Sequence, residues 1–377
     1  MTQPTLRILG IRGVPAAHGG FETFAEHLAL HLVARGWRVV VYCQETGAGP
    51  VQEDRWQGIE RVRIPVAQAG AAGTIVFDWH ATRHAAAHRD LCLTLGYNTA
   101  VFCAWLRLRG VPNVINMDGI EWSRAKWGPV AKTWFWLNER AGCWLGDHLV
   151  ADHPAIHAHL ATRTRAGKIT TIPYGADALA DRPEVPVRAL GLEPGRYLTL
   201  VARPEPENSI LEAVQGFSAR PRGVQLAVLG HYDAGHVYHR QVQAAAGSEV
   251  RFLGAIYDKQ VVQALRRHSL AYVHGHRVGG TNPSLVEALG AGNPVIAHDN
   301  RFNRWVAGAG AAYFDSAAAF DTVLSAVLAD PARLAAMAAA SRARFADGLT
   351  WPAVLQAYET LLCAQLPQAQ QLQAKLP

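Results

Sequence analysis

The sequence predicts an α/β protein built from two doubly wound domains. Short apolar runs alternate with longer stretches that repeat apolar residues at helical spacing, the pattern of βα units with parallel sheets. This alternation begins at Leu6–Ile11 and begins again at Tyr197–Val201, after the proline-rich segment Asp181–Pro186. A chain of 377 residues is also longer than a single domain with one hydrophobic core usually is. We therefore expect one domain over residues 1–180, a linker at 181–186, and a second domain over 187–350.

The strands expected from apolar runs fall into two groups of six. The first group is Leu6–Ile11, Trp37–Cys43, Leu91–Gly96, Val114–Met117, Asp147–Ala151 and Ile169–Pro173. The second group is Tyr197–Val201, Gln225–Leu229, Val250–Leu253, Leu270–His274, Val295–His298 and Ala311–Phe314. The alanine-rich stretch Ala317–Ala346 predicts helix with a break at Asp330-Pro331, and Trp351–Gln373 predicts a final helix with a frayed end.

Composition narrows the class of partner. The net charge of +6, from 36 Lys and Arg against 30 Asp and Glu, favours an anionic partner such as a nucleotide or an acidic membrane surface. No dense Lys/Arg run of the kind that binds nucleic acid is present. The five cysteines are scattered without a CxxC pair, so neither a disulfide framework nor a zinc site is predicted. With no signal peptide pattern and no apolar run of roughly 18–20 residues, we expect a cytoplasmic protein.

The stretch Val273–Gly290 carries the clearest candidate site. It predicts a strand end, a glycine-rich loop and the first turns of a helix. Pro283 suits the first helical position, and Asn282 or Thr281 can cap the helix. Such a helix start presents free backbone N–H groups and a partial positive charge, which bind anions. Glu287, one turn further on, faces the same space. The alternative is an ordinary loop-to-helix junction.

A second glycine-rich loop, Arg12–Gly20, follows the first expected strand. Its spacing does not fit GxGxxG, so NAD binding is not predicted, but Gly19-Gly20 lets a ligand approach the backbone closely. Arg203 stands at the end of a strand in the second half. Ligands of open α/β sheets bind at the carboxyl ends of strands. We expect these elements to meet in a cleft between the domains, where Arg203 holds a diphosphate.

Three motifs of nucleophilic, phosphate-binding or metal chemistry are missing from the sequence. There is no GxSxG elbow, no Walker A loop and no Asp-x-Asp pair. We therefore expect charge on a departing diphosphate to be stabilised without a metal ion. Asp118 and Glu121, just after another expected strand, are further candidates; alternatively, Asp118-Gly119 is a plain turn and Glu121 a solvated charge.

The segment Trp122–Trp144 combines five tryptophans with basic residues. One helical face of this segment is apolar. It consists of Val130, Trp134, Leu137, Ala141 and Trp144. We expect this face to pack on the sheet as part of a core helix with a charged back. The alternative is a basic and aromatic surface at a membrane interface.

The order of Gly19-Gly20, Arg203 and the loop and helix that reach Glu287 resembles the family 4 glycosyltransferases of the GT-B fold. Four segments look like the bacterial rhamnosyltransferase branch of that family. They are residues 13–26 (GVPAAHGGFETFAE), 118–127 (DGIEWSRAKW), 202–208 (ARPEPEN) and 279–287 (GGTNPSLVE). The resemblance implies two Rossmann-like domains facing across a cleft, with the helix at about 351–377 packed back on the first.

The resemblance also implies an activity. A retaining, metal-independent enzyme without a cofactor would move L-rhamnose from dTDP-L-rhamnose to a lipid- or glycan-linked acceptor, in the synthesis of surface polysaccharide. The reaction would take place in the cytoplasm or at the inner membrane face. In this family, front-side attack is thought to retain the configuration, with the departing phosphate taking the acceptor proton. Alternatives are a UDP- or GDP-hexose donor, or an epimerase-like or non-catalytic sugar-nucleotide binder.

Site residues are carried over by position. Asp118 and Arg203 would be catalytic, with Asp118 near the reacting sugar. The donor-binding set would be Gly19, Gly20, Arg203, Asn208, Gly280, Thr281, Asn282, Ser284 and Glu287. In that set Glu287 would bind the ribose, Thr281, Asn282 and Ser284 the sugar or phosphates, and Arg203 the diphosphate. The acceptor side would include Glu22, Glu121, Trp122 and Lys126, and no residue would bind a metal.

The sequence departs from the wider family at two positions. Gly279 stands where the family has a second Glu, and Asn208 stands where it has a Lys. The first departure predicts an altered donor preference. The second removes a phosphate charge, which Arg277, Lys259 or Lys126 would replace.

Overall fold

The structure is a computed structural model that describes residues 3–17 and 19–367. The chain divides into two compact units. The first comprises the residues up to Pro173 together with α14 (Trp351–Gln365), and the second is Tyr174–Thr350. The expected linker at 181–186 lies inside the second unit, where the Arg182 guanidinium donates to Gln263 Oε1 at 3.1 Å.

The first unit is built on an eight-stranded sheet in the order β3-β4-β2-β1-β5-β6-β7-β8. Its strands are β1 (Thr5–Leu9), β2 (Arg38–Thr46), β3 (Gln52–Trp56), β4 (Ile59–Val66), β5 (Leu91–Leu95), β6 (Asn113–Asn116), β7 (His148–Ala151) and β8 (Ile169–Thr171). All neighbours pair in parallel except β3 and β4. The strand order reverses between β1 and β5, which is the switch point of a doubly wound sheet.

The β3–β4 hairpin is an addition that the apolar pattern does not predict. Its two-residue turn, Gln57-Gly58, has positive φ at both positions, as a tight hairpin requires. β3 has almost no apolar residues and lies at the sheet edge. Charged cross-strand pairs stabilise it instead, since both guanidinium nitrogens Nε and Nη2 of Arg61 donate to Asp54 at 2.7 Å. A charged edge of this kind also disfavours further strand pairing.

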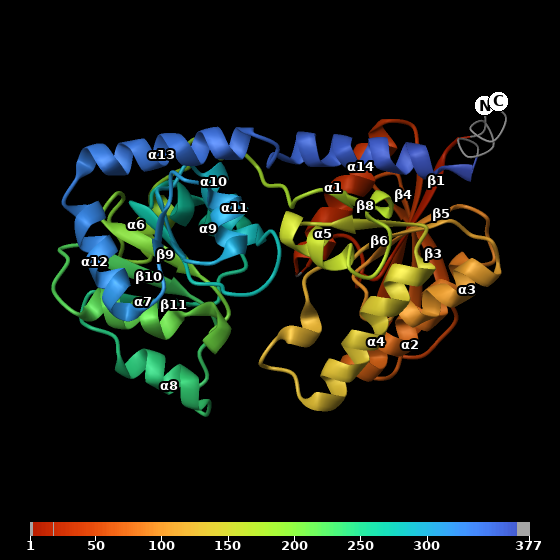
Figure 1. Ribbon diagram of the computed structural model, residues 1–377, viewed down its shortest axis with the longest axis horizontal. Helices are drawn as coiled ribbons and strands as arrows, with labels where there is room; N and C mark the ends of the chain where they lie inside the picture. Colours follow the sequence, from red (N-terminus) through yellow and green to blue (C-terminus); the bar gives the residue numbers. More distant parts are fainter. Residues whose placement is uncertain (1–2, 18, 368–377) are drawn as a thin grey trace. The chain divides into compact units, whose positions relative to one another are not determined.

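Helices cover both faces of this sheet. They are α1 (Gly20–Ala34), α2 (Gly70–Ala85), α3 (Cys103–Leu108), α4 (Pro129–Leu145), α5 (Pro154–Leu160) and α14, with 3-10 turns η1 (Ala100–Phe102), η2 (Glu121–Ser123) and η3 (Ala166–Lys168). In Figure 1, α14 runs beside α1 on one face, while α2, α3 and α4 lie on the other. The Phe24 and Tyr358 rings join α1 to α14 with centroids 4.5 Å apart. Tyr358 Oη accepts from Asn116 Nδ2 at 2.7 Å, which ties α14 to β6.

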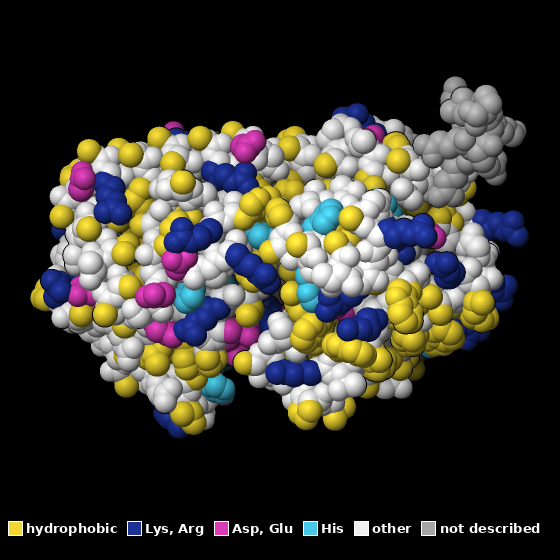
Figure 2. Space-filling view, in the orientation of Figure 1, with side chains coloured by type: hydrophobic (Ala, Val, Ile, Leu, Met, Phe, Trp, Pro, Cys, Tyr) yellow, Lys and Arg dark blue, Asp and Glu magenta, His cyan; other side chains and the backbone are white. Residues whose placement is uncertain are grey.

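The prediction for the apolar face of α4 is wrong. Val130 is 84% exposed, Leu137 53% and Trp144 68%. The residues of α4 that are buried are instead Asn138, Glu139, Gly142 and Cys143. Figure 2 shows hydrophobic side chains gathered at the surface in the region where Figure 1 draws α3 and α4.

Specific partners explain why the polar side of α4 turns inward. The buried Glu139 carboxylate accepts from Trp122 Nε1 at 2.8 Å and lies 3.0 Å from His159 Nε2 and 2.6 Å from Arg163 Nε. A buried carboxylate is tolerated when it is paired and hydrogen bonded in this way. Gly142 allows α4 to lie close to Met117, because a Cβ at this position would be only 3.1 Å from the Met117 side chain. These partners come from other segments, so helical periodicity alone predicts the wrong face.

The second unit is a six-stranded, all-parallel sheet in the order β11-β10-β9-β12-β13-β14. Its strands are β9 (Tyr197–Val201), β10 (Gln225–Leu229), β11 (Val250–Gly254), β12 (Ala271–His274), β13 (Val295–His298) and β14 (Ala312–Phe314). Its helices are α6 (Val185–Ala189), α7 (Ile210–Ser218), α8 (Val237–Ala244), α9 (Lys259–Arg267), α10 (Pro283–Gly290), α11 (Arg301–Ala307), α12 (Ala317–Leu328) and α13 (Pro331–Ala346), with a 3-10 turn η4 (Pro206–Asn208). The predicted helix break at Asp330-Pro331 is confirmed, since Asp330 caps α13. The strand order reverses between β9 and β12.

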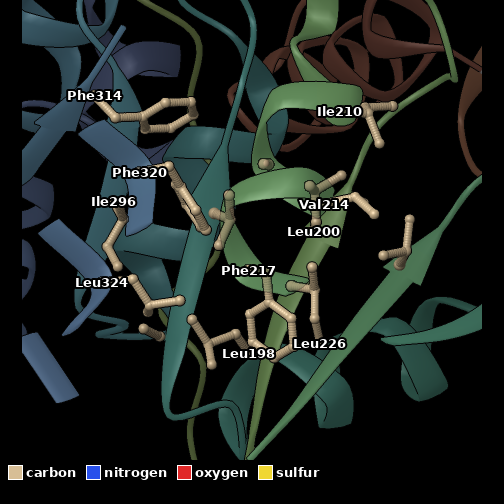
Figure 3. Packing of buried hydrophobic residues seen from close by; sticks show 14 of the residues in the cluster. Leu198, Leu200, Ile210, Val214, Phe217, Leu226, Ile296, Phe314, Phe320 and Leu324 are labelled. Atoms are coloured by element: carbon tan, nitrogen blue, oxygen red, sulfur yellow. The ribbon is translucent and has the colours of Figure 1, made fainter. Parts of the chain in front are cut away.

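Apolar side chains from α7, α12 and the strands form the main core of this unit (Figure 3). The Phe217 ring lies against Leu198 and Leu226 in this view, with 1% of Phe217 exposed. Smaller clusters beneath α9, α10 and α11 cover the other face of the sheet. This packing holds both sides of the β9–β12 junction in place.

Among the described residues, no single helix has the length and apolar composition needed to cross a membrane. The pair Ala317–Leu328 and Pro331–Ala346 meets those criteria together, but it is bent by 102°. The end of the expected last helix, from residue 368 onward, lies outside the described residues.

Candidate functional site

The strand order brings the candidate loops to the switch points of the two sheets. In the first unit, the glycine-rich loop leaves the carboxyl end of β1. In the second unit, the segment with Arg203 leaves β9 and the loop at 275–282 leaves β12. β9 and β12 are direct neighbours, with Leu200 opposite Val273, so these two segments start side by side. Both positions are where open α/β sheets bind ligands.

Close backbone contacts join the two segments of the second unit. A Cβ on Gly275 would lie 2.1 Å from the carbonyl oxygen of Asn208, so glycine is required there. Arg277 N donates to the Glu207 carbonyl at 3.0 Å, and Arg277 Nε donates to Ser209 Oγ at 2.6 Å. The Arg277 guanidinium also pairs with Glu212. Arg277 therefore stabilises the loop, and its positive charge is already paired with the Glu212 carboxylate.

Arg203 has an exposed side chain above this junction. Within the described part of the chain, its guanidinium has no hydrogen-bond or ion-pair partner. Its carbonyl oxygen accepts from Asn208 Nδ2 at 2.8 Å and from Glu205 N at 2.7 Å. Asn208 itself is buried beneath the loop. The structure thus places Asn208 as a support for the Arg203 segment, while the Arg203 charge is available to a ligand.

The start of α10 is capped as the sequence indicates. Asn282 Oδ1 accepts from Ser284 N at 3.0 Å, and Pro283 is the first helical residue. Gly280 is half-buried, and Thr281 is 3% exposed. Pro283 has no N–H, and the N–H groups of Leu285 and Val286 donate to the Asn282 carbonyl at 3.1 Å and 3.2 Å. The first turn therefore offers the positive end of the helix dipole and not free N–H donors.

Glu287 and Ser284 share a partner that sequence reasoning missed. Arg266, with 6% of its side chain exposed, forms an ion pair with Glu287 Oε2 at 2.6 Å and donates to Ser284 Oγ at 3.0 Å. Ser284 Oγ is also 2.6 Å from Tyr272 Oη. Glu287 keeps 42% of its side chain exposed, so Arg266 orients a carboxylate that still faces solvent. In the sequence, Arg266 looks like an ordinary basic residue at a helix end, and no local signal distinguishes it.

Histidines line the carboxyl ends of β12 and β13. The His274 and His276 rings stack with centroids 4.4 Å apart and an angle of 11° between their planes. Burial, reinforced by His276 and His298, lowers the pKa of His274 well below its ordinary value. His274 is therefore neutral at physiological pH and adds no positive charge to the loop.

In the first unit, two glutamates of α1 hold the glycine-rich loop. Ala16 N donates to Glu26 Oε2 at 2.6 Å, and Arg12 N donates to Glu22 Oε1 at 3.2 Å. Gly19 caps α1 with φ +93°, and a Cβ there would lie 2.4 Å from Glu22 Oε2. Gly20 is the first residue of α1. Glu22, expected on the acceptor side, thus shapes the loop.

This loop forms one wall of a pocket of about 280 Å³ that also borders β2 and β4. Arg61 and Arg63 line it, but both are committed to carboxylates, Arg61 to Asp54 and Arg63 to Glu45. Arg12 also lines it, and its exposed guanidinium has no partner in the described part of the chain. The pocket therefore offers one uncommitted cation and several fixed hydrogen-bonding groups, a set suited to a polar ligand.

The remaining candidates cluster after β6. Asp118 has φ +51°, and its N–H donates to Asn116 Oδ1 at 3.0 Å. Burial, with a smaller contribution from the Glu121 charge, raises the pKa of Asp118 to about 6. Glu121 accepts from Arg124 Nη1 at 2.8 Å and Trp127 Nε1 at 3.2 Å, so it is not a solvated charge.

Trp122 and Lys126 take part in packing around the same loop. Trp122 donates to the buried Glu139, and Lys126 Nζ lies 4.6 Å from the centroid of the Trp127 ring. In the described residues, no group of three or more His, Cys, Asp or Glu side chains is arranged to hold a metal ion. Three separate groups result: Arg203, Asn208 and 280–287 in the second unit, Gly19, Gly20 and Glu22 at α1, and Asp118, Glu121, Trp122 and Lys126 after β6.

Residues 207–360 match a family described as "Glycosyl transferase-like", and residues 3–177 match one described as "Domain of unknown function (DUF1972)". No curated protein sequence matches the chain significantly.

Solved structures cover nearly the whole chain. Sucrose-phosphate synthase from Thermosynechococcus elongatus is 20% identical with a TM-score of 0.78, over 96% of this chain and 100% of that one. α,α-Trehalose 6-phosphate synthase from Burkholderia multivorans is 14% identical with a TM-score of 0.76, over 100% and 99%. Anabaena HepE in complex with UDP and glucose is 15% identical with a TM-score of 0.74, over 96% and 100%. The predicted GT-B fold is confirmed, and the family match supports a glycosyltransferase.

Proposed function

We propose that this protein is a retaining, metal-independent glycosyltransferase that uses a nucleoside diphosphate sugar. The observation that carries the proposal is the junction of β9 and β12. There the uncommitted Arg203 follows β9, and the capped start of α10 follows the neighbouring β12. Arg266 orients the Glu287 carboxylate on α10. A guanidinium and the positive end of a helix dipole suit a diphosphate, and a carboxylate suits the paired hydroxyls of a ribose.

In this proposal, Arg203 neutralises the charge that develops on the departing diphosphate. A fixed cation can do this without a metal ion, because it is already in place when the bond to the sugar breaks. The acceptor hydroxyl attacks the anomeric carbon from the side of the leaving group. Its proton passes to the departing phosphate oxygen, so the configuration is retained and no dedicated enzyme nucleophile is needed.

We further propose L-rhamnose, delivered from dTDP-L-rhamnose, as the sugar, and a lipid- or glycan-linked molecule as the acceptor. Gly279 supports a donor that differs from the ordinary hexoses. It replaces the second glutamate of the wider family, and a Cβ built there meets no atom within 4 Å. The space normally filled by a hydroxyl-binding carboxylate is therefore open, which suits a sugar with fewer hydroxyls to bind.

A UDP-hexose is the second candidate donor. It is favoured by HepE, a protein with the same fold whose complex contains UDP and glucose. On the acceptor side, we propose that Asp118 and the pocket beside Arg12 contact the acceptor. An Asp118 carboxylate with a pKa of about 6 is ionised at neutral pH and can accept a hydrogen bond from a hydroxyl.

The first experiment identifies the donor. Purified protein is incubated with dTDP-rhamnose, UDP-glucose and GDP-mannose, with EDTA present, and products are measured by mass spectrometry. We expect transfer or slow hydrolysis of dTDP-rhamnose without added metal. In parallel, the matching nucleotide should raise the melting temperature more than the other two, because a ligand stabilises the state that binds it. Strict dependence on a divalent metal would contradict the mechanism.

The second experiment tests the site. Arg203→Ala should lower kcat by about 100-fold or more, the scale for removing one preorganised partner of developing charge. Glu287→Gln should mainly raise KM for the donor, because a ribose contact is the same in the ground and transition states. Arg333→Ala serves as a matched control, since Arg333 is also exposed and its guanidinium has no partner in the described part of the chain, but it lies on α13; it should leave donor hydrolysis unchanged. Full activity in Arg203→Ala would refute the assignment.

Gly279→Glu tests the donor preference. Gly279 has φ +120°, so any side chain there strains the backbone. Gly279→Ala carries the same strain without a carboxylate and is the matched control. We expect the glutamate variant, relative to the alanine variant, to shift the ratio of kcat/KM values toward a hexose donor.

A further inference from the structure

The outward face of α4 is apolar, although none of the described residues of the first unit covers it. Val130, Leu137 and Trp144 are spaced seven residues apart, so they form one stripe along the helix. They are 84%, 53% and 68% exposed. A surface helix of a globular protein ordinarily turns such a stripe toward the core. Here the core side of α4 is held by Glu139 and Gly142 instead.

The stripe continues onto the neighbouring segments. Leu108, at the end of α3, is 77% exposed and Val101, in η1, is 44% exposed. Arg107 of α3 donates from Nη1 to the carbonyl of Trp144 at 3.1 Å, which joins the two helices along this side. We define the α3–α4 surface by its exposed apolar side chains. They are Val101, Leu108, Val130, Trp136, Leu137 and Trp144.

The two helices carry only basic side chains at this surface, although the exposed Asp147 follows α4 three residues after Trp144. The charged side chains that α3 and α4 leave at the surface are Arg107, Lys132 and Arg140, whereas Glu139 is buried. Arg140 lies over the Trp136 ring, with Cζ 3.5 Å from the centroid, and Arg109 lies over Trp105 at 4.9 Å. Figure 2 shows the hydrophobic patch bordered by Lys and Arg side chains.

We propose that the α3–α4 surface docks on an anionic lipid bilayer. Tryptophan and arginine are suited to the headgroup region, because each combines an apolar body with a polar end. Exposed leucine and valine side chains gain by entering the acyl boundary, and the basic border is attracted to anionic headgroups. A second copy of the chain fits less well, since facing copies of this surface would place arginine against arginine. The proposal goes beyond the transfer reaction and does not depend on it.

Vesicle sedimentation tests the proposal with the full-length protein and with no donor or acceptor present. Wild type should pellet with vesicles of phosphatidylcholine and phosphatidylglycerol, and much less with phosphatidylcholine alone. Raising the ionic strength from about 0.1 M to about 1 M should reduce binding, because it shortens the Debye length from about 10 Å to about 3 Å. Binding that is indifferent to the anionic lipid would overturn the proposal.

Variants of the α3–α4 surface separate the contributions of its apolar and basic side chains to vesicle binding. Leu108→Ser with Trp144→Ser should reduce the bound fraction severalfold at equal lipid. Lys132→Gln should reduce the partition constant about fivefold, the share of one basic side chain near an anionic surface. The matched control is Val237→Ser with Tyr257→Ser, which removes apolar side chains that are 60% and 79% exposed in the second unit. It should bind as wild type does.

Two other results would also overturn the proposal. One is equal vesicle binding by wild type and the Leu108 and Trp144 double variant, with both shown to be folded by circular dichroism. The other is a concentration-dependent dimer in sedimentation velocity that the double variant abolishes, without vesicle binding by wild type; this surface would then be an interface between copies. Arg203→Ala should bind vesicles as wild type does. An error in the donor-site assignment would therefore leave the vesicle result unchanged, and the two proposals can fail independently.

Discussion

Replacing Asp118 by Asn tests the electrostatics of the loop after β6. Burial raises the pKa of Asp118 from 3.8 to about 6, so ionising this carboxyl costs the folded state more than the unfolded chain. A difference of about two pKa units corresponds to roughly 3 kcal/mol, at 1.36 kcal/mol per unit. Asn has nearly the same shape and tolerates the positive φ of this position. Asp118→Asn should therefore raise the free energy of unfolding at pH 7.5, by at most about 3 kcal/mol.

The pH dependence gives the sign of the effect. Between about pH 4 and pH 6 the folded state binds more protons at Asp118 than the unfolded chain does, so wild-type stability falls as pH rises through this window. Above this window the folded state bears the full free-energy cost of the ionised Asp118 carboxylate, and below it the carboxyl is protonated in both states and the cost vanishes. Asp118→Asn has no carboxyl at this position and lacks this pH dependence. The difference in free energy of unfolding between the variant and wild type should therefore grow from near zero at pH 4 to its maximum above pH 6.

Urea unfolding followed by tryptophan fluorescence measures this difference in the relevant unit, since every tryptophan except Trp305 belongs to the first unit. If the stabilities of wild type and Asp118→Asn run parallel from pH 4 to pH 7.5, the burial argument is refuted. If Asp118 contacts the acceptor as proposed, the more stable variant should also transfer sugar more slowly. Stability gained with activity lost is the expected signature of a functional carboxylate held in an unfavourable environment.

Three further predictions concern the rest of the chain. Of the five cysteines, only Cys363 is exposed, so one thiol should react with Ellman's reagent in native protein and five in urea; fast reaction of a second thiol would contradict this burial. Gly275→Ala should weaken nucleotide binding and lower the melting temperature, because its Cβ would lie 2.1 Å from the Asn208 carbonyl; unchanged nucleotide-induced thermal shifts would argue against the β9–β12 junction as the site. Phe217→Ala should cost about 3–5 kcal/mol of stability, measured by urea denaturation and circular dichroism, as expected for a fully buried ring in the second core; a cost under about 1 kcal/mol would mean a loosely packed core.

Strands β9 and β10 of the second unit were predictable because they are buried on both faces. Tyr197–Val201 and Gln225–Leu229 are short apolar runs bounded by polar loops, and the observed β9 and β10 have the same bounds as the predicted strands. The two glycine-rich loops were also predictable, since Gly275 and Gly19 stand where the backbone needs close approach or positive φ. Such requirements are local, so they leave a mark in the sequence.

The features that sequence did not predict depend on partners distant in the chain. β3 is stabilised by ion pairs across a hairpin, and its residues have no apolar signal. The orientation of α4 is set by His159 and Arg163, which pair with Glu139 from outside the helix. Arg266 acquires its role only when α9 and α10 come together around Glu287. Periodicity describes one element at a time and cannot report a pairing between two of them.

The assignment of α14 to the first unit has a consequence for synthesis on the ribosome. The second unit is a continuous segment, Tyr174–Thr350, whereas the first is completed only by residues that follow it. Until α14 emerges, Phe24 on α1 and Asn116 on β6 lack the cover and the hydrogen bond that Tyr358 supplies. The half of the protein that is translated first is thus the last to become complete, although domains ordinarily fold in the order of their translation. A chain that ends at Thr350 and is released from the ribosome should therefore carry a complete second unit and an incomplete first one.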